Sequence, residues 1–212
     1  MENNKGKIQK IKVSEVFPSI QGEGRYAGYP MLFIRTSGCN RACSWCDTTY
    51  HNQGRFFSIA DLIKRINKTK LEYICFTGGE PLLWREQIYE VIKKTLTKKH
   101  HLETNGDFLI KEDLKRFDYL AISPKDFTMA TEITALLSKF EKPSNYDIKI
   151  VTDLETTGKE LIPFATFLMP LTIYKPKKDL EIQQKVWNYC VKNNLKFCPR
   201  LQYFVWGKKK KI

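Results

Sequence analysis

The sequence lacks a long hydrophobic run. Its longest apolar-leaning stretch, residues 161–174, contains Pro163 and Pro170 and falls short of the roughly 20 residues that a membrane-spanning helix requires. The first residues are charged or polar and no apolar segment follows them, so a secretory leader is not expected either. These absences predict a cytoplasmic protein that does not insert into a membrane.

Internal repeats and Ser/Gly-rich linkers are also absent from the sequence. A chain of 212 residues can bury one substantial core but is short for two ordinary domains. We therefore expect one domain over residues 1–212. The low-complexity segment at 208–211 is a run of lysines, and its simplest interpretation is a solvated tail.

Acidic residues are fewer than basic ones, with 23 Asp and Glu against 36 Lys and Arg and a formal net charge of +13. Such a surface attracts polyanions or anionic small molecules, and the charge does not distinguish between them. The six cysteines are expected to be reduced thiols, because no secretory leader accompanies them. Cys75, Cys190 and Cys198 fall in predicted strands or helices, where we expect them to be buried.

The pattern of apolar residues alternates between strands and helices. Short β-branched and aromatic runs predict strands at 11–17, 31–37, 73–77, 101–104, 119–122, 146–151, 164–169 and 196–206. Helical periodicity predicts helices at 58–69, 86–99 and 180–193, with Leu96 on the buried face of the second. This alternation favours an α/β fold with a mostly parallel sheet. Because a complete barrel takes about 250 residues, we expect an incomplete TIM-type barrel that is open on one side.

Polar segments directly follow many of the predicted strands. They are Ser37-Gly38-Cys39, Thr77-Gly78-Gly79-Glu80, Glu103-Thr104-Asn105-Gly106, Ser123-Pro124-Lys125 and Met169-Pro170-Leu171-Thr172. In parallel sheets ligands bind at the carboxyl ends of the strands. We therefore expect these segments to converge on one rim and to form the functional site there.

Three closely spaced cysteines, Cys39, Cys43 and Cys46, form a C-x3-C-x2-C pattern. One interpretation is a structural zinc site completed by His51. The other is an iron–sulfur cluster of four irons, in which three cysteines leave one iron open to bind a small molecule. An open iron indicates chemistry rather than electron storage alone.

The cysteine spacing, with Trp45 before the last cysteine, resembles the signature of radical S-adenosylmethionine enzymes. Residues 78–81, Gly-Gly-Glu-Pro, resemble a second motif of the same enzymes. More narrowly, residues 17–24, 33–35, 46–48, 77–81, 123–125 and 201–206 resemble the 7-carboxy-7-deazaguanine synthase family, so the likeness spans nearly the whole chain. The resemblance implies a short, dimeric, incomplete barrel. It also implies conversion of 6-carboxy-5,6,7,8-tetrahydropterin to 7-carboxy-7-deazaguanine with release of ammonia, on the route to queuosine and related deazapurines.

The resemblance further implies a [4Fe–4S] cluster, S-adenosylmethionine and Mg²⁺ as cofactors, and an electron donor such as flavodoxin or ferredoxin. Cluster ligands would be Cys39, Cys43 and Cys46, and no catalytic residue is implied beyond the cofactor-bound radical. The implied substrate-binding residues are Ile20, Gln21, Gly22, Arg35 and Thr77, and the implied Mg²⁺ ligand is Thr48. The implied S-adenosylmethionine contacts are Trp45, Cys46, Asp47, Gly79, Glu80, Ser123, Pro124, Lys125, Met169, Pro170, Leu171 and Thr172. Met169 stands where the family often has Gln and cannot donate a side-chain hydrogen bond, so only backbone contacts are expected there.

Two other functions fit parts of the sequence. An activase that places a glycyl radical on a partner enzyme would share the cysteine spacing, but it supplies no role for residues 21–24 or Thr48. A zinc-stabilised, basic RNA-binding module would use the net charge, the three cysteines with His51 and the lysine tail. The basic residues are spread over the ends of the predicted helices, and no aromatic residues alternate with them on one face of the protein. Nucleic acid is therefore not expected as a direct partner.

Overall fold

The computed structural model describes residues 9–46, 52–140, 145–207 and 209. Within them, nine strands form one sheet in the order β3-β1-β2-β4-β5-β6-β7-β8-β9. The strands are β1 (Lys10–Ile20), β2 (Pro30–Thr36), β3 (Arg55–Ser58), β4 (Tyr73–Gly78), β5 (Lys99–Thr104), β6 (Tyr119–Ile122), β7 (Tyr146–Thr152), β8 (Phe167–Pro170) and β9 (Lys196–Phe197). β1 is antiparallel to β2 and β3, and the remaining pairings are parallel. The predicted mostly parallel, open sheet is therefore confirmed.

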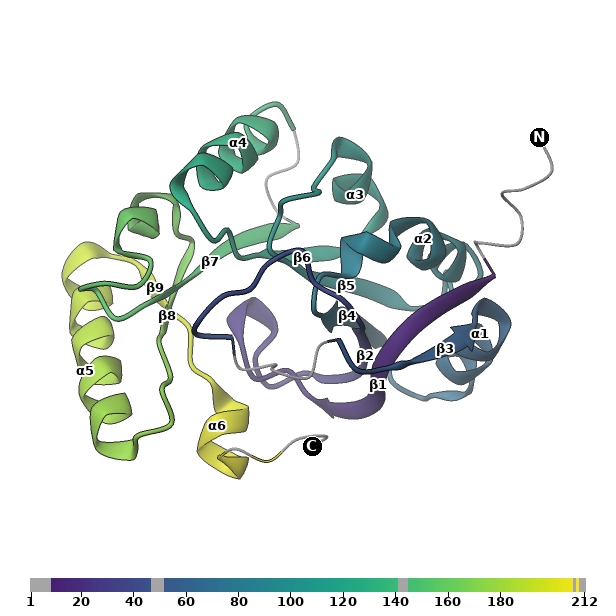
Figure 1. Cartoon of the computed structure of the whole chain (residues 1–212), viewed down its shortest axis with the longest axis horizontal. Coiled ribbons are helices and arrows are strands. Elements are labelled where there is room, and N and C mark those ends of the chain that lie inside the picture. Colours follow the sequence, from purple (N-terminus) through teal and green to yellow (C-terminus); the bar gives the residue numbers. More distant parts are fainter. Residues whose placement is uncertain (1–8, 47–51, 141–144, 208, 210–212) are drawn as a thin grey trace.

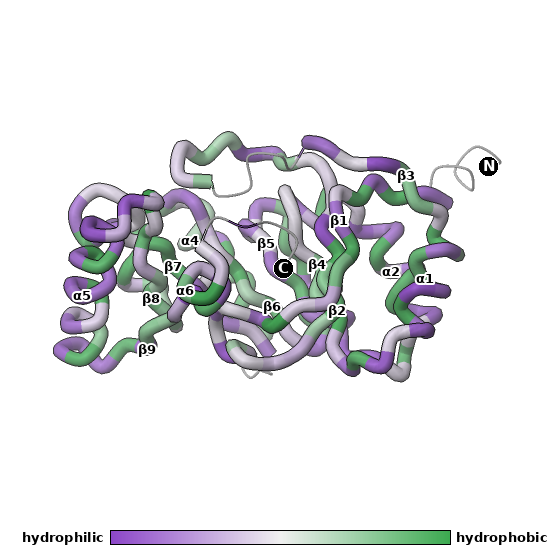
Figure 2. Tube along the Cα trace, turned by 90° about the horizontal axis from the view of Figure 1, so that it is seen from below, coloured by the Kyte–Doolittle hydropathy of each residue, from purple (hydrophilic) through white to green (hydrophobic). Residues whose placement is uncertain are grey.

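Helices cover the outer face of the curved sheet (Figure 1). They are α1 (Ile59–Lys68), α2 (Arg85–Lys93), α3 (Lys111–Arg116), α4 (Phe127–Leu137), α5 (Pro176–Asn193) and α6 (Leu201–Trp206), with 3₁₀ turns η1 (Gly24–Tyr26), η2 (Pro81–Trp84) and η3 (Lys159–Phe164). α6 differs from the others because it lies on the open side of the sheet, between α5 and β2 (Figures 1 and 2). Among the described residues, no helix is both long and apolar enough to cross a membrane.

The core lies between the sheet and the outer helices. Hydrophobic residues run along the strands, whereas hydrophobic and hydrophilic residues alternate along α1 and α5 (Figure 2). α1 begins where the Ser58 side chain accepts a hydrogen bond from the Asp61 amide, and it buries Leu62 and Ile66 against the sheet. Each fully buried side chain of this kind contributes roughly 1.5–3 kcal/mol. This packing holds the strand ends, and therefore the rim, in fixed positions.

Two predictions about local structure are wrong. The predicted strand at 196–206 ends at Phe197, and residues 201–206 form helix α6 instead. Pro199 has no amide to donate to a neighbouring strand, and the Leu201 amide donates to the Gly22 carbonyl at 3.0 Å, which starts the turn away from the sheet. Leu96 is 77% exposed, because α2 ends at Lys93 before reaching it. The pattern also gave no indication of β3, α3 or α4.

Candidate active site

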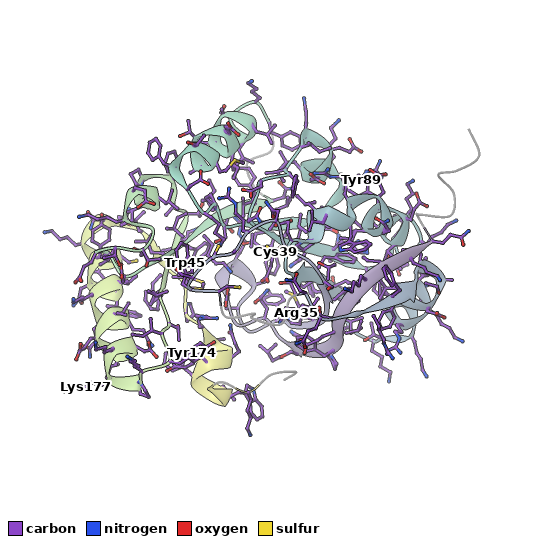
Figure 3. All side chains as sticks on the ribbon, viewed as in Figure 1. Arg35, Cys39, Trp45, Tyr89, Tyr174 and Lys177 are labelled. Atoms are coloured by element: carbon purple, nitrogen blue, oxygen red, sulfur yellow. The ribbon has the colours of Figure 1, made fainter. Side chains whose placement is uncertain are left out.

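A cavity of about 360 Å³ opens at the carboxyl ends of the parallel strands, a volume within the usual range of small-molecule sites. All of the predicted rim segments contribute to its lining, through Cys39, Thr77, Glu103, Ser123 and Met169 among others. The end of β1 and the C-terminal segment around α6 complete the wall. In Figure 3, Arg35, Cys39 and Trp45 lie near the centre of the molecule, whereas Tyr89 and Lys177 lie on the outer helices.

The three clustered cysteines all line this cavity. Burial raises the pKa of the Cys39 thiol, and the negative charges of Glu80, Cys43 and Cys46 act in the same direction. A cationic group among these sulfurs would relieve that repulsion. Among the described residues, no three His, Cys, Asp or Glu side chains form a group that could hold one metal ion. Three thiolates suit an iron–sulfur cluster that keeps one iron open, whereas a closed zinc site needs a fourth ligand, and the predicted one, His51, lies outside the described residues.

Two glycines allow the end of β4 to approach the cysteine loop. A Cβ at Gly78, whose φ is +133°, would lie 2.3 Å from the Thr36 carbonyl oxygen, and one at Gly79 would lie 1.9 Å from the Gly38 carbonyl oxygen. The next residue, Glu80, donates its amide to that Gly38 oxygen at 2.8 Å. Glycine is therefore required here by a backbone-to-backbone contact.

Glu80 does not line the cavity, and its side chain is fully buried. Its carboxylate accepts hydrogen bonds from the Leu82 amide at 2.9 Å, the Thr104 hydroxyl at 2.8 Å and the Asn105 amide at 2.8 Å. Burial raises the pKa of Glu80 despite these donors. The geometry supports a role for Glu80 in joining the ends of β4 and β5, rather than the predicted direct contact with S-adenosylmethionine.

A carboxylate that sequence reasoning assigned no role links two of the predicted substrate residues. Glu103 accepts a hydrogen bond from the Gln21 side-chain amide at 3.0 Å and another from the Thr77 hydroxyl at 2.7 Å. All three residues line the cavity, and half-exposed Ile20 lies at its edge. Gly22 also lines the cavity and packs against the C-terminal segment, where a Cβ on it would lie 1.7 Å from the Gln202 side-chain oxygen.

Arg35 lines the same cavity and is held by its neighbours on β1. Its Nε lies 3.0 Å from Glu15 Oε2, and its guanidinium carbon lies 5.8 Å from the centre of the Phe17 ring. Because Nε is already paired, the two terminal nitrogens of Arg35 form the edge that can bind a substrate carboxylate in a bidentate manner.

A buried charge network that the sequence did not reveal lies beside these residues. The Glu23 carboxylate is paired with the Lys149 ammonium and accepts from Arg200 Nε at 3.3 Å and from Gln202 Nε2 at 2.7 Å. Burial opposes ionisation of Glu23, but the charges of Lys149 and Arg200 outweigh it and lower its pKa to about 2. The sequence signal was Lys149 within a predicted strand, 146–151, whose other residues except Asp147 are apolar or aromatic.

On the predicted cofactor side, Ser123 and Lys125 line the cavity, and Lys125 Nζ donates to Ser123 Oγ at 3.0 Å. Trp45, Met169, Leu171 and Thr172 also line it, whereas Pro124 and Pro170 are not among the lining residues. Asp47, the predicted Mg²⁺ ligand Thr48 and the predicted fourth zinc ligand His51 lie outside the described residues.

Comparison with known proteins places this fold and site in a class. Residues 33–152 match the family model of the radical SAM superfamily. The chain therefore belongs to the radical S-adenosylmethionine enzymes, whose members carry a [4Fe–4S] cluster and S-adenosylmethionine. This membership favours the cluster interpretation of the three cysteines over the zinc interpretation.

Individual relatives narrow the class. The chain is 32% identical to a 7-carboxy-7-deazaguanine synthase from Hyperthermus butylicus over 92% of both chains. It is 44% identical to one from Thermoplasma acidophilum over 47% of this chain and 48% of that protein, so that match spans about half of the relative. The solved structure of QueE from Escherichia coli covers 93% of this chain and 98% of its own at a TM-score of 0.57 and 16% identity, which shows the shared fold. The chain belongs to the 7-carboxy-7-deazaguanine synthase family.

Proposed function

We propose that this protein converts 6-carboxy-5,6,7,8-tetrahydropterin to 7-carboxy-7-deazaguanine with release of ammonia, in the biosynthesis of queuosine and related deazapurines. The observation that carries the proposal is one cavity in which the cysteine loop faces the hydrogen-bonded set of Gln21, Thr77 and Glu103. The relatives that match most of the chain bear the name of this activity.

Cys39, Cys43 and Cys46 hold the cluster in this proposal, and Trp45, Gly79, Ser123, Lys125 and residues 169–172 surround S-adenosylmethionine. When bound, the cluster and S-adenosylmethionine would supply the radical chemistry that removes a hydrogen atom from the substrate. The protein's own task is to orient the substrate and to keep water from the site. This cavity suits that task because the cofactor and substrate residues share its walls.

Substrate recognition follows from two charged groups that line the cavity, Glu103 and Arg35. A pterin presents N–H donors along one edge, and Glu103 can accept them because Gln21 and Thr77 hold its carboxylate in a fixed orientation. Arg35 then binds the substrate carboxylate with its terminal nitrogens. The backbone at Gly22 allows close approach to the flat ring.

Further parts of the proposal rest on the family resemblance. They are a Mg²⁺ ion on Thr48 and a homodimer. The proposal also includes a single domain over residues 1–212, from the chain length, and a cytoplasmic location, from the sequence patterns described above. An acidic one-electron carrier such as flavodoxin or ferredoxin would supply electrons, and the net charge of +13 favours its approach. A Mg²⁺ that binds one hydroxyl needs substrate oxygens to complete its shell, so the ion is expected to enter with the substrate.

The test is anaerobic reconstitution with iron and sulfide, followed by incubation with reductant, S-adenosylmethionine, Mg²⁺ and the carboxytetrahydropterin. Mass spectrometry should then detect the deazapurine, and Cys39→Ala should yield none because it holds no intact cluster. A fully loaded cluster that leaves the pterin unchanged would refute the proposal. Transfer of a radical to a glycyl-radical enzyme under the same conditions would support the activase instead.

A further inference from the structure

One arginine within the cysteine loop is bound by two carboxylates from other rim segments. Arg41 lies between Cys39 and Cys43, and its Nε and Nη2 are 2.5 and 2.8 Å from the two oxygens of Asp107. Its Nη1 is 2.7 Å from Asp126 Oδ2. Asp107 follows β5 and Asp126 follows β6, so a single guanidinium joins the cysteine loop to two neighbouring strand ends.

A second layer of hydrogen bonds supports this arrangement, which we term the Arg41 clamp (Arg41, Asp107 and Asp126). Asn40 Nδ2 donates to Asp107 Oδ2 at 2.5 Å, and Asn105 Nδ2 donates to Asn40 Oδ1 at 2.9 Å. The Asp107 amide in turn donates to Asn105 Oδ1 at 2.8 Å. The side chain of Asp107 is only 8% exposed, so this pair is better shielded from water than an ordinary surface ion pair.

The clamp residue Arg41 also forms a backbone hydrogen bond to the sulfur of Cys39. The backbone amide of Arg41 donates to Cys39 Sγ at 3.4 Å. Hydrogen bonds to the ligand sulfurs are one of the factors that set the reduction potential of an iron–sulfur cluster, because they stabilise its more negative state. Since the side chain of Arg41 is held at both ends of its guanidinium, its amide is held in place as well.

We propose that Arg41 is a positioning residue whose clamp with Asp107 and Asp126 orders the Cys39–Cys43 segment for cluster binding and keeps the Arg41 amide directed at the Cys39 sulfur. This inference depends on the proposed function in one respect, namely that these cysteines bind an iron–sulfur cluster. Bidentate pairing requires the planar fork of arginine, and lysine at this position would keep the charge but lose the geometry.

The molecule contains a matched control. Arg85 Nε and Nη2 each lie 3.1 Å from an oxygen of Asp113, in a bidentate pair that joins the start of α2 to α3. Asp113 is fully buried, so Arg85→Lys should lower the melting temperature of the chain at least as much as Arg41→Lys does. Arg85 also donates from Nη2 to the carbonyl of Phe108, the residue after Asp107, but both of these partners lie outside the cysteine loop, whereas Arg41 lies within it.

The experiment compares wild type, Arg41→Lys, Asp126→Asn and Arg85→Lys after anaerobic reconstitution. It measures iron and sulfide per chain, the rate at which a chelator removes the cluster, and the midpoint potential of the cluster by EPR titration. Arg41→Lys is expected to lose the cluster about tenfold faster, equivalent to about 1.4 kcal/mol, at a lower midpoint potential. Asp126→Asn should change the loss rate and the midpoint potential less than Arg41→Lys does, because asparagine can still cap α4 by accepting a hydrogen bond from the Met129 amide. Arg85→Lys should match wild type in iron and sulfide content, in cluster-loss rate and in midpoint potential, although its melting temperature falls.

Wild-type loading, loss rate and potential in both Arg41→Lys and Asp126→Asn would overturn the proposal. Equal cluster loss in Arg41→Lys and Arg85→Lys would also overturn it, because the effect would then reflect general stability. A fully loaded wild type that left the pterin unchanged would refute the proposed function and leave this comparison valid.

Discussion

Glu23→Gln should destabilise the protein far more than the loss of an ordinary ion pair. The substitution removes the negative charge that faces Lys149 and Arg200, whose side chains are 10% and 12% exposed. The Glu23 pKa of about 2 lies about 2.5 units below its ordinary value of 4.5, which corresponds to about 3 kcal/mol at neutral pH. Breaking a buried ion pair costs about 3–5 kcal/mol in general, so both arguments agree. For a chain of this length, the melting temperature should fall by about 6–12 °C.

The measurement is thermal and urea unfolding of wild type and Glu23→Gln as a function of pH. Because the pKa of Glu23 is lower in the folded state, its contribution is complete above about pH 4.5 and is lost as the pH falls toward 2. The gap between the two proteins should therefore narrow over that range. The control is Glu155→Gln, which removes an exposed pair with Lys185 and should cost about 1 kcal/mol or less. Equal losses in the two variants would refute the reasoning.

Three further predictions concern other positions. Gly22→Ala should raise the KM for the pterin, because its Cβ would lie 1.7 Å from the Gln202 side-chain oxygen. A second change, Gln202→Ala, should relieve this clash and lower the KM again. A KM that stays high in the double variant would contradict this account. Gly79→Ala should abolish cluster loading, measured as iron per chain, since its Cβ would lie 1.9 Å from a backbone oxygen of the cysteine loop; normal loading would contradict it. Burial lowers the pKa values of His100 and His101 to about 4, so on acidification the unfolded chain binds protons before the folded chain does. The free energy of unfolding should therefore decrease as the pH falls from 6.5 to 4, by up to about 1.4 kcal/mol per pH unit for each histidine. Urea titrations at pH 7, 6 and 5 test this, and a flat profile would contradict it.

The position of the site was predictable because it follows from topology. Parallel strands place their carboxyl ends on one edge, so polar residues directly after predicted strands converge whatever their distance in sequence. Cys39, Thr77 and Ser123 accordingly line one cavity. The glycines at 78 and 79 had a local signal as well, although the sequence did not reveal that they lie against the carbonyl oxygens of Thr36 and Gly38, respectively.

The partnerships within the site were not predictable in the same way. Gln21 and Glu103 are 82 positions apart, and Glu23 and Lys149 are 126 positions apart, so no local pattern connects them. Their pairing depends on how β1 turns over the strand ends. Residues 201–206 have the aromatic and β-branched composition of a strand, but the short β9 and the break at Pro199 leave them no neighbouring strand to pair with.

The central claim is that one rim cavity brings the cofactor's radical and the pterin together. The most direct test uses pterin deuterated at the carbons of its reduced ring, incubated anaerobically with the reconstituted protein, S-adenosylmethionine and reductant. Mass spectrometry should then find deuterium in the 5′-deoxyadenosyl group along with formation of the deazapurine. A 5′-deoxyadenosyl product free of deuterium, formed while the pterin remains unchanged, would contradict the account.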